Sequence, residues 1–96
     1  MSDIVNAAVT ALQERLGGDT FDGSAKFVIE DEGAVMIDGA GVRAADEEAE
    51  VTMTADADTF QSIMDGDLNA TAAFMSGKLS VDGDMGQAMK LGTVLS

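Results

Sequence analysis

The chain has 96 residues, a size typical of one domain, and 46% of them are hydrophobic, which excludes a disordered segment. It contains no cysteine and no histidine, which excludes disulfides, thiol chemistry and the commonest general base and metal ligand. The formal net charge is −13 and the five Lys and Arg residues are scattered, so nucleic acid is excluded as a partner.

The first predicted element is an amphipathic helix over residues 3–16. Apolar residues recur there at intervals of three and four, which places them on one stripe of a helix. Ser2 is suited to cap its start, and Gly17 with Gly18 to end it.

Short apolar runs follow, and they have the composition of β-strands. Residues 26–30 and 34–38 predict an antiparallel hairpin, with Gly33 in the left-handed position of its loop. A weak third strand is expected at 42–45, and a fourth at 51–54. The acidic residues between these two strands, Asp46, Glu47 and Glu48, are predicted to form a solvated loop.

Helical spacing returns after the fourth strand. Thr54 is predicted to cap a helix that ends at Gly66, and Asn69 to cap a short helix that ends at Gly77. Residues 78–82 predict a fifth strand.

The last predicted helix carries Met85, Ala88, Met89, Leu91 and Leu95 on its apolar positions. Asp84 and Gln87 stand three residues apart, as in a capping box, at its start. The order of the elements predicts an α+β fold of mixed α/β layers, in which helices cover one face of a sheet.

Two motifs resemble functional sites but lack the required context. Residues 39–44 match Gly-x-Gly-x-x-Ala, but acidic residues follow at once and would repel a pyrophosphate, so a hairpin turn is expected there. A calcium loop starting at Asp56 would need glycine where Gln61 stands. Hydroxyls such as Ser76 and Ser80 have no histidine to activate them. We therefore predict no catalytic residue, no metal site and no cofactor.

Seven methionines are many for a chain of this length. They fill an irregular core, or they line a pliable pocket for apolar ligands. The residues alone leave both interpretations open.

One segment carries a specific resemblance. The run from Phe74 to Leu79, then Val81-Asp82-Gly83-Asp84-Met85 and a helix, resembles the sterol carrier protein type 2 (sterol-binding) domain family, over about residues 4–95. The resemblance implies a five-stranded sheet covered on one face by about four helices, which enclose an apolar ligand tunnel. The lining residues that it implies are Phe60, Ile63, Met64, Phe74, Met75, Met85 and Met89.

We accordingly interpret residues 1–96 as a single, non-enzymatic lipid-binding domain. Its expected partner is a hydrophobic small molecule: a fatty acid, a phospholipid, or a sterol-like or isoprenoid lipid. No apolar run is long enough to span a membrane, and Asp3 stands where a secretory signal would be basic, so the expected location is the cytoplasm.

Two alternatives remain at this point. The domain could present a hydrophobic substrate to lipid or quinone biosynthetic enzymes as an accessory factor. It could also be a structural interaction domain with its methionines packed as ordinary core.

Overall fold

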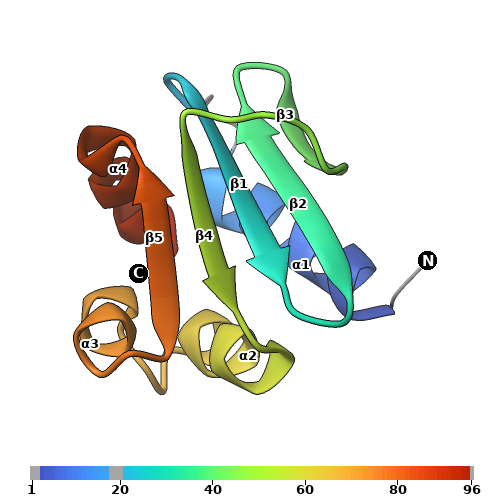
Figure 1. Cartoon of the computed structure of the whole chain (residues 1–96). Helices are drawn as coiled ribbons and strands as arrows, with labels where there is room; N and C mark the ends of the chain where they lie inside the picture. Colours follow the sequence, from blue (N-terminus) through green and yellow to red (C-terminus); the bar gives the residue numbers. More distant parts are fainter. Residues whose placement is uncertain (1–2, 18–20, 96) are drawn as a thin grey trace.

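The computed structural model describes residues 3–17 and 21–95, with the backbone alone at residue 95 (Figure 1). Ser2 and Gly18, predicted to bound the first helix, lie outside these residues. The elements in chain order are α1 Asp3–Leu16, β1 Ser24–Ile29, β2 Gly33–Asp38, β3 Gly41–Ala44, β4 Val51–Ala55, α2 Ala57–Asp65, α3 Ala70–Met75, β5 Leu79–Gly83 and α4 Met85–Leu95.

The five strands form one mixed sheet in the order β3-β2-β1-β4-β5. β1 and β4 are parallel, with Ala25 opposite Val51, and the other neighbouring strands are antiparallel. The parallel pair arises because residues 45–50 lead from the end of β3 back across β2 and β1 to the start of β4 (Figure 1). The α+β fold expected from the sequence is confirmed.

The helices cover one face of this sheet. α1 packs against β2 and β3, α4 packs against β1, β4 and β5, and α2 and α3 lie at one end (Figure 1). Between these layers, Phe27 of β1 is fully buried and meets Phe60 of α2 edge to face, with ring centroids 4.7 Å apart. This aromatic pair joins the sheet to the helices at the centre of the core.

The opposite face of the sheet carries charged side chains around Met36. Met36 is buried there, between Lys26 and Arg43 on the neighbouring strands. Lys26 Nζ lies 2.9 Å from an oxygen of Asp46, and Arg43 donates to Asp38 at 3.0 Å. The pairing with Arg43 holds the pKa of Asp38 below its usual value. The basic stems and residues 45–50 thus shield a methionine that the strand alternation would otherwise expose.

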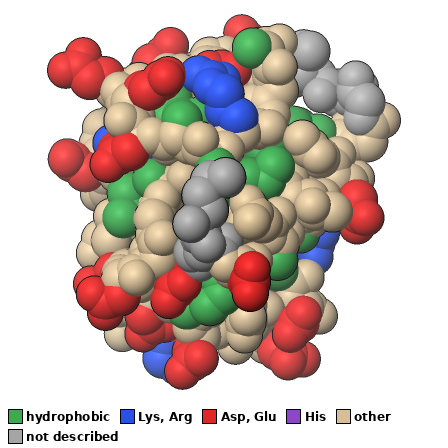
Figure 2. Space-filling model, turned by 90° about the vertical axis from the view of Figure 1, so that its right-hand side faces the viewer, with side chains coloured by type: hydrophobic (Ala, Val, Ile, Leu, Met, Phe, Trp, Pro, Cys, Tyr) green, Lys and Arg blue, Asp and Glu red, His purple; other side chains and the backbone are tan. Residues whose placement is uncertain are grey.

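On another side of the molecule, acidic side chains outnumber basic ones (Figure 2). Figure 2 shows the side of the molecule that is on the right in Figure 1, where Asp and Glu are spread around the face and Lys and Arg are few.

The turns confirm one sequence prediction and correct another. Residues 39–40 form the tight turn between β2 and β3, and the Asp38 side chain accepts from the Ala40 amide at 2.9 Å. The Gly-x-Gly motif is thus a hairpin turn. The prediction for the first hairpin is wrong in its position: Gly33, with a φ of 147°, is the first residue of β2 and pairs with Ile29. The left-handed position of the loop belongs to Asp31, whose φ is 65°.

The helix caps differ in part from the prediction. Thr54 lies within β4, and the N-cap of α2 is Asp56, whose side chain accepts from the Thr59 amide at 2.7 Å. Asp84 caps α4 by accepting from the amides of Gly86 and Gln87. The Asp84 amide donates to the Glu50 carbonyl, so the reciprocal half of the capping box is absent.

Gly83 is required by a close approach between two chain segments. Its φ is 114°, and a Cβ at this position would lie 2.4 Å from the carbonyl oxygen of Glu50. Any side chain would therefore push β5 away from the start of β4.

The Asp56 cap yields a prediction about pH. Its hydrogen bonds with Thr59 hold the pKa of Asp56 below its usual value. Because the folded-state pKa is lowered, the carboxylate stabilises the fold at neutral pH and loses that effect as the pH falls through the folded-state pKa. We expect Asp56→Ala to lower the free energy of unfolding at neutral pH, with a smaller difference in strong acid. Denaturation at several pH values measures this. Asp56→Asn, which preserves the cap, is the control, and a pH-independent difference would contradict the prediction.

Candidate functional site

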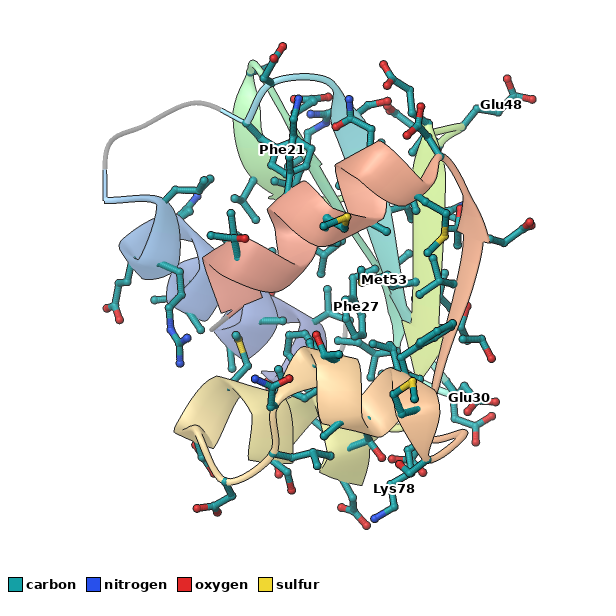
Figure 3. All side chains as sticks on the ribbon, turned by 90° about the vertical axis from the view of Figure 1, so that its left-hand side faces the viewer. Phe21, Phe27, Glu30, Glu48, Met53 and Lys78 are labelled. Atoms are coloured by element: carbon teal, nitrogen blue, oxygen red, sulfur yellow. The ribbon has the colours of Figure 1, made fainter. Side chains whose placement is uncertain are left out.

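A cleft of about 330 Å³ opens between α3 and α4. Figure 3 shows α4 above and α2 and α3 below, with Met53 of β4 and Phe27 between them. β4 and β5 supply the floor of the cleft, and the two helices supply its sides. Its lining residues are Met53, Ala70, Thr71, Phe74, Leu79, Val81, Met85, Ala88, Met89, Gly92 and Thr93.

The lining of the cleft is apolar and uncharged. Thr71 and Thr93 are its two residues with polar side chains. Thr93 lies in the last turns of α4, and its hydroxyl donates to the Met89 carbonyl at 3.1 Å. A surface of this kind removes a hydrocarbon chain from water and offers hydroxyl groups, but no ionised group, to a polar head.

α4 produces the open side of the cleft because its apolar side chains extend beyond the part of the helix that packs on the sheet. Ala88 and Leu91 are buried against the sheet, whereas Met85 is 55% exposed and Met89 is 74% exposed. Since Met85 and Met89 are four residues apart, their side chains lie on one face of the helix, above the cleft. Phe74 of α3, 43% exposed, lies on the other side. Large exposed apolar side chains gathered at one opening are typical of a binding site.

The seven residues implied by the family resemblance lie in different surroundings. Phe74, Met85 and Met89 line the cleft, whereas Met75 is 78% exposed beside it and does not line it. Ile63 is buried in the core. The ligand-binding role of all seven stays a prediction.

Phe60 and Met64 lie at a second groove, of about 360 Å³, between α1 and α2. Phe60 is 2% exposed, so it belongs mainly to the core, and Met64 is half-buried. This groove also contains charged and amide side chains, Asp65 and Gln61, and is therefore less suited to a hydrocarbon chain.

The sequence interpretation missed the residues that form the floor of the cleft. Met53 and Val81 lie opposite each other on β4 and β5 and both line the cleft. Strand alternation puts Met53 on the same face of its strand as Val51, which was the available signal. The sequence did not indicate that Gly92 lines the cleft, because a glycine within a helix does not show whether a cavity lies beside it.

Two findings concern metals and membranes. Among residues 3–17 and 21–95, no three acidic side chains lie together in a way that could hold a metal ion. None of the helices in this part of the chain has the length and apolar character needed to cross a membrane.

Comparison with known proteins identifies the family. The model of the SCP-2 sterol transfer family matches residues 9–96, so the chain belongs to this family. The recognition made from the run between Phe74 and Met85 is confirmed.

Curated relatives are much longer proteins. Hydroxysteroid dehydrogenase-like protein 2 of Xenopus tropicalis is 34% identical over 96 residues, which cover 92% of this chain and 23% of that protein. The Bos taurus protein of the same name is 36% identical over 90 residues, which cover 93% of this chain and 20% of that protein. The chain thus spans about a fifth of the length of these relatives.

Solved structures share the fold. The sterol carrier protein domain 2 of Helicoverpa armigera superposes with a TM-score of 0.76 at 28% identity, over 96% of this chain and 85% of that one. Sterol carrier protein 2 of Aedes aegypti, in complex with the fatty acid palmitate, superposes with a TM-score of 0.76 at 22% identity, over 100% of this chain and 97% of that one.

Proposed function

We propose that this domain binds a lipid hydrocarbon chain in the cleft between α3 and α4 and shields it from water. The observation that carries the proposal is the exposure of Phe74, Met85 and Met89 around one uncharged opening. Burying this surface and a lipid chain together provides about 25 cal/mol per Å² of apolar area removed from water. The palmitate complex of the Aedes aegypti protein, which has the same fold, supports this function.

We propose that the ligand leaves chemically unchanged. The polar side chains of the lining are two threonine hydroxyls, and the sequence has no histidine or cysteine that would activate a hydroxyl or attack a lipid. The enclosed tunnel and the cytoplasmic location expected from the sequence stay predictions.

The test is extraction and identification of the lipid. Native mass spectrometry of protein purified from its own host is expected to show one lipid per chain, and the delipidated protein is expected to bind a fluorescent fatty-acid or fatty-alcohol probe at one site. Failure to bind fatty acids, fatty alcohols, sterols, phospholipids and quinones would contradict the proposal. Recovery of a hydrolysed or oxidised ligand would contradict its non-enzymatic part.

A second function is favoured by the length of the relatives. The matched region is about a fifth of proteins named as dehydrogenase-like. We therefore propose, as an alternative, that the domain presents a hydrophobic substrate to a lipid- or quinone-modifying enzyme. Co-purification with such an enzyme, and faster turnover of its lipid when the domain is added, would separate this role from that of a free carrier.

The Met89→Ala variant tests whether Met89 binds lipid in the cleft or packs as part of the core. Because its side chain is 74% exposed, Met89→Ala is expected to lower the free energy of unfolding by under about 1 kcal/mol. The affinity for a long-chain lipid is expected to fall about fivefold to tenfold, since each lost methylene contact is worth up to about 0.8 kcal/mol.

Met75→Ala is the matched control, because Met75 is 78% exposed and does not line the cleft. It is expected to change neither quantity. Denaturation of delipidated protein and a lipid titration measure both. An equal loss of affinity in the two variants would place Met75 at the site and contradict the cleft boundaries given above.

A further inference from the structure

We infer that the cleft selects lipids with an uncharged head group, such as a long-chain alcohol or an ester, over a lipid of the same chain length that ends in a carboxylate. This inference rests on the proposed function, because it concerns the head group of the chain held in the same cleft.

The first observation is the absence of a cation from the lining. Thr71 and Thr93 are the polar side chains among the residues that line the cleft in the described part of the chain, and both are neutral. A carboxylate at this opening would meet hydroxyl groups but no lysine or arginine. A hydroxyl or an ester carbonyl is uncharged and needs no charged partner. The absence of lysine and arginine from the lining therefore does not weaken the binding of a lipid with such a head group.

The second observation is that all five basic residues are directed elsewhere. Lys26 and Arg43 pair with acids on the opposite face of the sheet. Arg15 donates to the Met64 carbonyl, which lies between α1 and α2. Lys90 lies 3.2 Å from an oxygen of Asp22. Lys78 points outward from the far side of α3, away from Met53 at the floor of the cleft (Figure 3).

The third observation is the negative field at the cleft. Asp84, which precedes the lining residue Met85, is exposed. Asp82 is exposed as well, but strand alternation directs its side chain to the face of the sheet opposite the lining residue Val81. The whole chain adds a net charge of −13. Since like charges repel over about one Debye length, an anionic head at the opening is disfavoured even when it stays in contact with water.

The experiment compares two lipids that differ in the head group alone. Delipidated protein loaded with the uncharged dye Nile red is titrated with 1-tetradecanol and with tetradecanoate at about pH 8, where the carboxyl group is ionised. At about 0.01 M salt, we expect the alcohol to bind about tenfold more tightly than the acid. Raising the salt to about 0.15 M should reduce this ratio about threefold, because the screening length shortens from about 30 Å to about 8 Å.

A pair of lysine variants tests whether the preference is set at the cleft. Thr93 and Thr10 are both exposed helical threonines whose hydroxyls donate to the carbonyl four residues earlier, but Thr10 lies on α1, outside the cleft. Thr93→Lys is expected to tighten tetradecanoate binding about fivefold relative to tetradecanol. Thr10→Lys makes the same change in net charge and is expected to leave the ratio within about twofold.

The outcomes separate the inference from the proposed function. Equal affinity for the two lipids, tighter binding of the acid, or an equal effect of the two lysine variants would overturn the head-group inference while lipid binding stands. If neither lipid displaces the dye or binds in a direct titration, the proposed function fails, and the inference fails with it.

Discussion

The Gly92→Phe variant is expected to lose lipid binding while it stays as stable as the parent chain. Gly92 lines the cleft, and a Cβ at this position would have no heavy atom within 4 Å beyond its chain neighbours and the backbone of its own helix. A phenyl ring would therefore enter open space instead of the core. Replacing a glycine within a helix by phenylalanine also favours folding, by about 0.3–0.5 kcal/mol.

The ring would occupy the space that we assign to the lipid chain. The affinity for a long-chain lipid is expected to fall at least about 30-fold, equivalent to about 2 kcal/mol. The free energy of unfolding is expected to stay within about 1 kcal/mol of the parent value.

Ala72→Phe is the matched control, because it adds the same ring at an exposed position of α3 that does not line the cleft. It is expected to bind lipid as the parent chain does. Lipid titration and chemical denaturation of both variants give the comparison. Unchanged binding in Gly92→Phe would show that the lipid occupies another site, and the groove between α1 and α2 would be tested next.

The second large effect is expected at Phe60, where the change falls on stability. Phe60 is 2% exposed and packs edge to face against Phe27, so Phe60→Ala removes a ring from the centre of the core. We expect the free energy of unfolding to fall by about 3–5 kcal/mol. Since a domain is stable by about 5–15 kcal/mol in total, this loss is a large fraction of the whole.

Phe74→Ala provides the comparison with an exposed phenylalanine. Phe74 is 43% exposed at the cleft, so its truncation is expected to cost under about 1.5 kcal/mol and to weaken lipid binding. Denaturation of the delipidated proteins measures both values. A small stability loss in Phe60→Ala together with weaker binding would return Phe60 to the ligand site that the family resemblance implies.

The secondary structure of this chain could be predicted well because its local signals agree. The three- and four-residue spacing in α1, Gly66 at the end of α2, and Asn69 at the start of α3 all act where the sequence placed them. The cap of α2 was misplaced by two residues because Thr54 and Asp56 are both good capping residues. What decides between them is the end of β4, whose pairing with β1 and β5 includes Thr54.

The methionines show where local signals were insufficient. Met36 and Met53, on strands, are buried, whereas Met75, Met85 and Met89, on helices, are exposed. The sequence left core and pocket open for all of them because hydrophobicity is the same in both. The difference depends on which elements lie beside each side chain.

The sequence by itself thus determined the order and type of the elements, the absence of cysteine and histidine chemistry, the strong negative charge and the family. The tertiary structure alone decided that β4 returns parallel to β1, that α4 turns Ala88 and Leu91 to the sheet, and that Met85 and Met89 consequently face the cleft. The physical reason is that the apolar side chains of α4 spread over a broad arc, so its periodicity does not decide which of them face the sheet and which stay exposed. Packing against β1, β4 and β5 selects the rotation, and that selection creates the candidate site.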